Sequence, residues 1–590
     1  MAGSQFYYGG SHSSDASWPN YKSYGTVRAG DMPPSYASAS ADRSPLLSNS
    51  TAASRSSNAR RNNWCVIITV VALHLVAGFF AIQFLVNHWG STQTPPTTPP
   101  TYNVAIIGGG PAGIAAAQHL RSMPTARDVR FNITIFESKP VLGGVLALHN
   151  ANGSSVFPKD DPMQDPITAE DITGKALVWS NTLFTQDSER ILEDKVNFLE
   201  LGPEQIAYYR NTAKTVSATR PFGKTPTGTW LQLLWAYGSS IWRGDQLAQD
   251  GNLRQAILKV PLKANVEDIF AALGVLKPLK QQAKAMLKER SISDRYATEI
   301  IEPQVQRAYG HGLNQVTGLM AMMAAAWEES ANAYQGGDLI DRLQRIVREI
   351  GVDVRTSTRV TTVRGVKINE KRPAWLIRYE GAQDGDGDGD GSPIELFDKV
   401  IMAASDPSIL LEFNYQEFLE FTERHHDDDG VGGIPTVPAM QQQDAPPAPV
   451  HVTFFTTDAR ISPWGNDNED QALFLEASKA AGMRELALVR EITNYEDPSA
   501  ETEYLYRVLS QKPVLGELQK RAKITWSFET RIENAYPLLS PLQSYPPFKL
   551  QWLNSLWWTY TIQRAATSVD LNWLAGKIVA QDLIREVTGR

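Results

Sequence analysis

Three glycines in one short loop have the spacing of a phosphate-binding turn. An apolar, strand-like segment runs into Gly108-Gly-Gly110-Pro-Ala-Gly113, and a helical pattern follows. In such a turn the first glycine permits a sharp bend, the second lets the backbone approach a pyrophosphate, and the third lets the helix pack closely on the strand. Pro111 and Ala112 belong to this turn, and a helix is expected over Ile114–Arg121, whose free N–H groups and positive dipole end attract phosphates. The loop therefore predicts a dinucleotide-binding site.

An acid and a second glycine pair follow this turn. Glu137 ends the next strand-like segment, roughly 20 residues beyond the turn, where an acid can accept hydrogen bonds from a ribose. Gly143-Gly144 comes shortly after the acid. Large FAD enzymes of the glutathione-reductase and amine-oxidase type carry a glycine pair at this place, so the pair favours FAD over NAD. Those enzymes often continue with arginine. This chain has Val145, so another group must supply that phosphate contact.

The rest of a nucleotide-binding sheet is expected late in the chain. Strand-like segments occur at 352–363, which contains Val360, at 374–379 and at 399–404. Near the C-terminus, the segment 565–570, which contains Ser568 and Val569, opens a helical pattern that continues to 584. A helix N-terminus there can stabilise the negative charge of a reduced flavin, although a plain amphipathic helix would show the same pattern. We expect Val360, Ser568 and Val569 to contact the cofactor.

Composition excludes several classes of function. The net charge is −8 and no basic stripe occurs, which argues against a nucleic-acid partner. The single cysteine, Cys65, lies in an apolar N-terminal run, so the chain beyond it has no disulfide, thiolate metal site or cysteine nucleophile. The acidic run 384–395 formally fits a calcium loop, but Gly391 replaces the usual apolar residue and strand-like sequence flanks the run. We therefore expect no metal site.

The N-terminal hundred residues predict a membrane anchor. Residues 1–62 lack an apolar period and are expected to be a disordered cytosolic tail. Residues 63–88 contain an apolar run without Asp, Glu, Lys or Arg that is long enough for one transmembrane helix. A cleaved signal peptide is the alternative, but the run starts far from Met1 and is long for that purpose. Residues 89–101 are rich in Pro and Thr and predict an extended stalk.

Charge and short motifs predict the orientation and the address. Arginines precede the apolar run, and no Lys or Arg follows it until Arg121, so the positive-inside rule places the catalytic domain in a lumen as a single-pass type II protein. The segment from Asp42 to Leu47 resembles an acidic dileucine signal read by sorting adaptors, although such pairs also arise by chance. Sequons begin at Asn132 and Asn152, and Asn152 is the better acceptor because Asn132 opens a strand expected to be buried. A vacuole or lysosome is the expected compartment of this endomembrane glycoprotein.

Several segments, taken together, resemble the prenylcysteine oxidase family, also called prenylcysteine lyases. Besides the glycine turn, Glu137 and the glycine pair, these segments are 230–238, 300–323 with Arg307-Ala-Tyr-Gly310 in its centre, 334–340, 400–404 and 554–580. They occur in the family's order and cover most of residues 102–590. The Tyr-Gly segment followed by the Gly-Gly-Asp turn at 336–338 is more diagnostic than the glycine fingerprint.

The resemblance implies an FAD-dependent thioether oxidase. Members cleave farnesyl- or geranylgeranyl-cysteine with oxygen as acceptor and release a prenyl aldehyde, cysteine and hydrogen peroxide. The flavin does the difficult step, so little acid–base machinery is needed. The resemblance places Tyr309, His311, Tyr560 and Gln563 near the flavin as candidates, without assigning a catalytic role to any of them.

The sequence departs from the family at positions expected near the flavin. The family has an acid where Gln563 stands, an Asn where Tyr560 stands, and an Asn where Asp338 stands. These changes leave open an oxidase of another lipophilic substrate, such as an amine or a terpenoid. Together with Val145 they also leave open a non-catalytic, membrane-tethered flavoprotein.

The expected fold class is α/β, with a Rossmann-type FAD-binding domain of the glutathione-reductase and amine-oxidase type and an α+β substrate domain. The FAD-binding parts are expected at 102–164, 331–411 and 551–590, and the substrate parts at 165–330 and 412–550, the latter with an insertion at 424–449.

Both substrate parts are rich in Leu, Trp, Met and Phe at helical spacing. We expect two stripes of large apolar residues, each along one helix. The first consists of Trp230, Trp235, Tyr237 and Trp242, and the second of Leu319, Met320, Met322, Met323 and Trp327. Core packing explains any one of these residues, but together they could line an apolar tunnel for a prenyl chain, worth ~0.8 kcal/mol per CH₂ buried.

Overall fold

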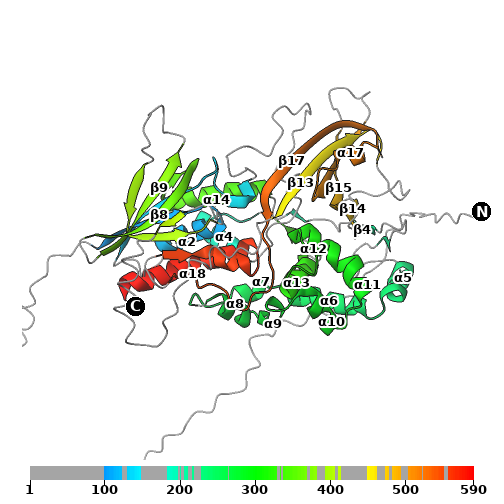
Figure 1. Ribbon diagram of the computed structural model, residues 1–590, viewed down its shortest axis with the longest axis horizontal. Helices are drawn as coiled ribbons and strands as arrows, with labels where there is room; N and C mark the ends of the chain where they lie inside the picture. Colours follow the sequence, from blue (N-terminus) through cyan, green and yellow to red (C-terminus); the bar gives the residue numbers. More distant parts are fainter. Residues whose placement is uncertain are drawn as a thin grey trace, which may run out of the picture. The chain divides into compact units, whose positions relative to one another are not determined.

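The computed structural model describes 99–122, 129–147, 182–196, 199–200, 205–209, 216–217, 227–263, 265–327, 332–333, 336–368, 372–381, 393–404, 410–412, 448–460, 472–476, 482–492, 502–520, 522–550 and 556–589 (Figure 1). All of them belong to the second of the two units into which the chain divides, Thr97–Arg590. The predicted cytosolic tail, transmembrane helix, most of the stalk, the sequon at Asn152 and the predicted insertion at 424–449 lie outside the described residues. Among the described residues, no helix is both long enough and apolar enough to cross a membrane.

A five-stranded parallel sheet forms the nucleotide-binding part. Its strands, in the order β18-β11-β1-β2-β7, are Leu556–Trp558, Lys399–Met402, Thr101–Ile107, Arg130–Phe136 and Asp353–Arg355. The four residues of β11 and the last four of β1 are buried, as expected for strands covered on both faces. The strands predicted around 102–107 and 399–404 are confirmed. The strand that Asn132 was predicted to open is mostly buried in β2, but the side chain of Asn132 itself is exposed and its Nδ2 donates to Asn103 Oδ1 (3.1 Å).

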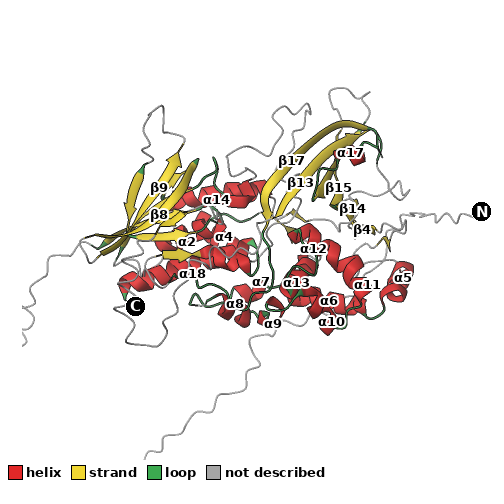
Figure 2. Cartoon of the chain, in the orientation of Figure 1, coloured by secondary structure: helices red, strands yellow, loops and turns green. Residues whose placement is uncertain are grey.

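Helices α2 (Pro111–Ser122), α4 (Leu183–Leu192), α14 (Gly336–Ile350) and α18 (Val569–Thr588) pack around this sheet (Figures 1 and 2). Small residues let α18 cross α2 closely, because a Cβ added to Gly576 would lie only 2.1 Å from Ala112 O. The predicted C-terminal helix is confirmed, with Ser568 as its N-cap. The Ser568 hydroxyl accepts from Leu571 N (3.1 Å), which satisfies one of the free N–H groups of the first turn.

A four-stranded sheet, in the order β10-β9-β8-β12, covers one side of the parallel sheet. Its strands are Ile394–Phe397, Arg372–Gly381, Thr358–Ile368 and Leu410–Glu412. Apolar side chains of both sheets, among them Ile107, Phe136 and Trp375, form one buried cluster. The predicted strand region 352–363 is divided, because a turn at Ser357 (φ 50°) separates β7 from β8.

The second predicted substrate part is mainly sheet where the structure describes it. Seven strands pair in the order β17-β13-β16-β15-β14-β4-β5: Ile524–Tyr536, Ala448–Thr457, Glu503–Ser510, Met483–Ile492, Ala472–Glu476, Gln205–Tyr209 and Val216–Ser217. The described helix among them is α17 (Leu515–Leu518), and a separate pair consists of β3 (Leu199–Glu200) and β6 (Asn332–Ala333). The helical spacing inferred for 412–550 was therefore wrong. The β-branched and aromatic residues of β13 and β17 favour extended backbone, and that preference prevailed.

The first substrate part contributes α4, β3, β4 and β5 to the layers described above, and the rest of its described residues are mainly helical. These helices are α5 (Thr227–Tyr237), α6 (Ser240–Gly251), α7 (Arg254–Ile257), α8 (Val266–Ala272), α9 (Leu276–Leu279), α10 (Ala283–Glu289), α11 (Asp294–Tyr296), the π-helical η3 (Ala297–Ile301), α12 (Glu302–Tyr309) and α13 (Gly318–Trp327). The stripe predicted on one helix spans two, and Trp235 and Trp242 are exposed (94% and 52%) while Tyr237 is buried. Leu319, Met320 and Met322 are buried on α13, as predicted.

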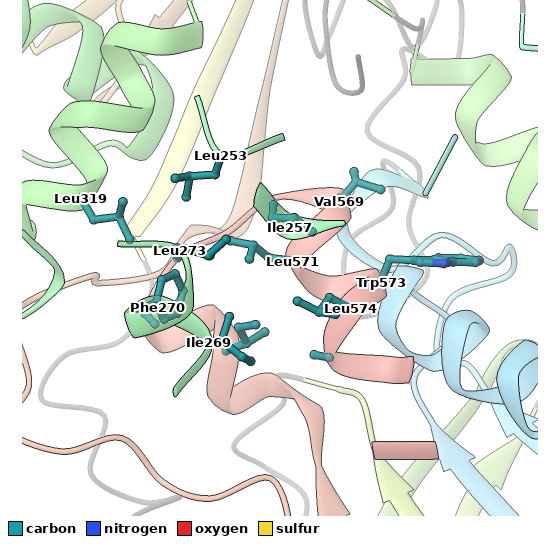
Figure 3. Packing of buried hydrophobic residues seen from close by; sticks show 14 of the residues in the cluster. Leu253, Ile257, Ile269, Phe270, Leu273, Leu319, Val569, Leu571, Trp573 and Leu574 are labelled. Carbon is teal, nitrogen blue, oxygen red and sulfur yellow. The ribbon is translucent and has the colours of Figure 1, made fainter. Parts of the chain in front are cut away.

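The N-terminal half of α18 joins these helices to the nucleotide-binding part. Figure 3 shows Leu571 and Leu574 of α18 beside Ile269, Phe270 and Leu273, which lie in and just after α8. Trp573 points to the other side of α18 and contacts Phe184 of α4 edge to face, with ring centroids 5.1 Å apart. One buried cluster thus extends across α18.

Candidate dinucleotide-binding site

The first glycine of the turn is fixed by the ends of two neighbouring strands. Gly108 N donates to Phe136 O at the end of β2 (2.8 Å), and Ala403 N donates to Ile107 O after β11 (2.8 Å). Gly108 has φ +111°, and a Cβ there would lie 2.9 Å from the backbone of Ala403. No other residue fits this position without moving the sheet, which agrees with the role predicted for the first glycine.

The second and third glycines differ in what surrounds them. A Cβ on Gly113 would lie 2.1 Å from Gly108 O, so Gly113 is required for α2 to begin directly against the turn. A Cβ on Gly110 would meet Gly144 Cα at 3.6 Å, an ordinary contact. The protein's own packing therefore does not require glycine at 110. A pyrophosphate that approaches the backbone at this point would require it.

The predicted glycine pair lies against this turn. Gly143 N donates to Gly109 O (2.9 Å), and a Cβ on Gly144 would lie 3.1 Å from Gly110 Cα. Both residues of the pair have positive φ, 128° and 60°. Val145 follows in a short 3₁₀ turn, η2 (Gly144–Ala147), with 71% of its surface exposed, and it offers no charge to a phosphate. The structure thus brings the turn and the pair together, as the sequence predicts.

Glu137 holds the turn in shape and remains able to bind a ribose. The side chain is buried; Oε2 accepts from Gly109 N (2.8 Å) and Oε1 accepts from Lys139 N (3.0 Å). A carboxylate has about four acceptor positions, so positions remain for sugar hydroxyls. The backbone carbonyl of Glu137 accepts from Thr358 N (2.9 Å), which places the start of β8 beside the acid. Val360 follows in β8 with its side chain buried, so its backbone would have to provide the predicted cofactor contact.

Lys139 is a site residue that the sequence reasoning missed. Its Nζ donates to Gly144 O (2.8 Å), directly before the exposed Val145. Burial lowers the pKa of Lys139, while the nearby charge of Glu137 acts in the opposite direction. The ammonium group therefore lies at the glycine pair, the place where large FAD enzymes of the glutathione-reductase and amine-oxidase type often have an arginine. The sequence does contain a signal for this contact, because Lys139 is a basic residue two positions after Glu137, the acid that follows β2.

We expect Lys139→Ala to weaken binding of FAD, the dinucleotide that the sequence predicts, about tenfold. Loss of one charge-assisted contact to a phosphate has about this effect. Fluorescence titration of the FAD-free protein with FAD measures the change. Lys520→Ala removes a lysine that is 71% exposed and pairs with Glu517, and it should leave the affinity unchanged. An unaltered affinity in Lys139→Ala would show that this lysine does not contact the cofactor.

The N-terminus of α18 extends beyond the crossing with α2. From Gly576, which contacts Ala112, the helix continues seven residues back to Val569, or about 10 Å along its axis. The buried carboxylate of Asp570 accepts from Phe184 N (2.9 Å) and joins this end to the start of α4. Ser568 and Val569 therefore lie close enough to the glycine turn for one dinucleotide to reach both.

The four flavin-side candidates come from two separate places. Tyr560 is buried in the cluster between the two sheets, 5.9 Å from Trp558 between ring centroids, and burial raises its pKa. Gln563, in the 3₁₀ turn η5 (Thr559–Arg564), donates from Nε2 to Asn572 Oδ1 in the first turn of α18 (2.6 Å). Tyr309 and His311 lie at the end of α12, where burial raises the pKa of Tyr309 and lowers that of His311.

The described part of the chain holds no cluster of three or more His, Cys, Asp or Glu side chains arranged for a metal ion. The polar groups present around the turn are instead backbone N–H groups, one carboxylate and one ammonium. This donor set fits the phosphates and the ribose of the ADP half of FAD.

Comparison with known proteins identifies one domain. Residues 106–162 match the family of NAD(P)-binding Rossmann-like domains. No curated protein matches the sequence significantly. Similar solved structures include a triple mutant of putrescine oxidase (TM-score 0.48, 13% identity, 82% of this chain and 99% of that chain). Others are an oxidoreductase from Methanosarcina mazei (0.45, 11%, 83% and 100%) and a reduced UDP-galactopyranose mutase (0.42, 11%, 83% and 94%). The chain therefore contains a dinucleotide-binding domain of the Rossmann type.

Proposed function

We propose that this protein is an FAD-dependent oxidoreductase. The observation that carries the proposal is the assembly of Gly110, Gly144, Glu137 and Lys139 around one turn at the start of α2. The backbone of the turn and the N-terminus of α2 would hold the pyrophosphate, Glu137 the ribose, and Lys139 a phosphate. The glycine pair packed on the turn favours FAD over NAD. Bound FAD would supply the redox chemistry by accepting a hydride.

The substrate that we propose is a prenylcysteine or a close thioether analogue. Support comes from the sequence resemblance to prenylcysteine oxidases and from the apolar character of the helical part. Leu319, Met320 and Met322 of α13 are buried in the same cluster as Leu571 of α18. Burial of a prenyl chain among such residues is worth ~0.8 kcal/mol per CH₂, so the tail could provide most of the binding free energy.

The proposed reaction requires the protein to bind and orient the thioether and one water molecule more than to transfer protons. Hydride is lost from the carbon next to sulfur, water adds to that carbon, and the carbon–sulfur bond breaks. One thioether, one O₂ and one H₂O give one aldehyde, one thiol and one H₂O₂. Tyr309 fits such a site because burial keeps its phenol protonated, so it can donate a hydrogen bond but not act as a base at neutral pH.

We expect farnesylcysteine to bleach the flavin of the purified full-length protein under anaerobic conditions. In air the same mixture should release aldehyde and hydrogen peroxide in equal amounts, which enzyme-coupled peroxide detection and aldehyde derivatisation measure. A flavin that is bound but remains oxidised with farnesylcysteine would contradict the thioether substrate.

A second candidate function is oxidation of a different lipophilic substrate. It is favoured by Gln563, an amide that donates to Asn572 Oδ1. The prenylcysteine oxidases that the sequence resembles have an acid at this position. A panel of lipophilic amines and terpenoid alcohols, followed by the same flavin bleaching, separates the two candidates. Bleaching by an amine or an alcohol, but not by farnesylcysteine, would favour the second.

A further inference from the structure

Arg484 occupies an irregular position in the seven-stranded sheet. Its neighbours Met483 and Glu485 pair with Ser510 and Leu509 of β16, which are consecutive residues. Arg484 is therefore the extra residue of a β-bulge in β15. Bulges redirect a side chain out of the regular alternation of a strand, and they occur often beside functional sites.

The bulge directs Arg484 towards the end of α12, where it is only partly satisfied. The side chain is 2% exposed, Nη2 donates to Gly310 O (2.8 Å), and the guanidinium carbon lies 4.9 Å from the ring centroid of Tyr536. Among the described residues, Nε and Nη1 find no hydrogen-bond partner. These two nitrogens carry three of the five N–H groups of a guanidinium. A buried cation with most of its donors unused is unfavourable unless it binds something.

The adjacent carboxylate cannot serve as the partner of Arg484. Glu485 is buried and already accepts from Arg307 Nε through Oε2 (2.7 Å) and from Arg507 Nε through Oε1 (2.9 Å). In the part of the chain that the structure describes, no carboxylate oxygen lies within 4.0 Å of the Arg484 guanidinium. Desolvation lowers the pKa of Arg484, and Tyr536 acts in the opposite direction. A negatively charged group would therefore satisfy donors of Arg484 that no described residue uses.

The surroundings of Arg484 connect it to the apolar helices. Gly310 ends α12, and α13, with its buried Leu319 and Met320, follows in the chain. Tyr536 ends β17, and three residues later Leu539 O accepts from Thr317 N (2.9 Å), just before α13. Arg484 is thus connected to the apolar helix α13 in two ways, through Gly310 and through the segment that follows Tyr536.

We propose that Arg484 binds the carboxylate of an amphiphilic substrate whose apolar tail lies against the helical part. The proposal rests on the proposed function, since prenylcysteine has both groups. A carboxylate suits the site because it carries a single charge and accepts several N–H bonds. His311 follows Gly310 directly, and no described residue hydrogen-bonds its Nε2, so we include it among the groups that the same polar head could contact.

The test compares charged and neutral ligands on the full-length protein with its cofactor bound. Michaelis constants are measured for farnesylcysteine and its methyl ester. Dissociation constants are measured for benzoate and benzamide, which do not depend on turnover. The variants are Arg484→Met and Arg484→Lys, with Arg531→Met on β17 as the control, because Arg531 is exposed and pairs with Glu533.

Wild type should prefer farnesylcysteine to its ester, and benzoate to benzamide, by roughly 10- to 100-fold, as expected for a hydrogen bond to a charged group. Arg484→Met should abolish both preferences, Arg484→Lys should keep part of them, and Arg531→Met should keep them in full. Equal binding of acid and neutral ligand by wild type, or a full preference in Arg484→Met, would overturn the proposal. If Arg484→Met does not fold, the proposal is tested by the acid-over-neutral preference of wild type and by its partial loss in Arg484→Lys. If farnesylcysteine is not oxidised but the benzoate preference depends on Arg484, the proposed function fails and the carboxylate site stands.

Discussion

Replacing Gly110 by alanine should lower FAD affinity about 100-fold, which is roughly 2.8 kcal/mol, while the protein stays folded. The new methyl group would lie 3.6 Å from Gly144 Cα, an ordinary contact, so the fold accepts it. The same methyl group would stand between the two glycine segments, where the pyrophosphate must approach the backbone. Fluorescence titration with FAD measures the affinity, and circular dichroism with thermal melting measures the fold.

Two further glycine variants separate cofactor binding from folding. Gly113→Ala should lose both, because its Cβ would lie 2.1 Å from Gly108 O and α2 would have to move. Gly516→Ala should lose neither, since nothing lies within 4 Å of its Cβ position. A Gly110→Ala protein that binds FAD as tightly as wild type would mean that this turn does not hold the phosphates.

Removing the Asp187 carboxylate should destabilise the protein by about 3–5 kcal/mol, the usual cost of leaving a buried charge without its partner. Asp187 accepts from Lys577 Nζ (2.6 Å), Trp573 Nε1 (3.0 Å) and Arg190 Nη2 (2.9 Å), and so joins α4 to α18. In Asp187→Ala the nearly buried Lys577 ammonium would lose this acceptor. Equilibrium urea unfolding of both proteins measures the difference in unfolding free energy.

The pH dependence of that difference provides an internal control. Burial raises the pKa of Asp187, but Lys577, Trp573 and Arg190 together outweigh burial and hold the pKa below its usual value. A depressed folded-state pKa gives a contribution that is complete above the unfolded pKa, about 3.9, and that is lost as the pH falls through the folded pKa. The deficit of Asp187→Ala should therefore be constant near neutral pH and should shrink in strong acid. A deficit below 1 kcal/mol at neutral pH would show that this network does not hold α4 to α18.

The parts of the fold that the sequence predicts well are those set by local requirements. Gly108, Gly113, Glu137 and the glycine pair lie within about 40 residues of one another, and each has one physical role in the turn. Two strands of the parallel sheet, β1 and β11, end in continuous buried apolar runs. Their identity depends little on the rest of the chain.

The rest depends on contacts between distant segments. Lys139 reaches Gly144 only because the chain doubles back after β2, so the replacement of an arginine by Val145 looked like a lost contact. Tyr560, in the 3₁₀ turn η5, is buried in the core between two sheets, which the sequence around it does not show. Arg484 stands out only because a bulge, set by pairing with β16, directs it to Gly310.

The absorbance spectrum of the purified full-length protein is the most direct test of FAD binding at the glycine turn. We expect the visible bands of oxidised flavin, retained through gel filtration in wild type and missing in Gly110→Ala. Wild type freed of its cofactor should also melt at a higher temperature when FAD is added, because FAD binds the folded state. A colourless protein whose melting temperature does not respond to FAD would contradict the assignment of a flavin site.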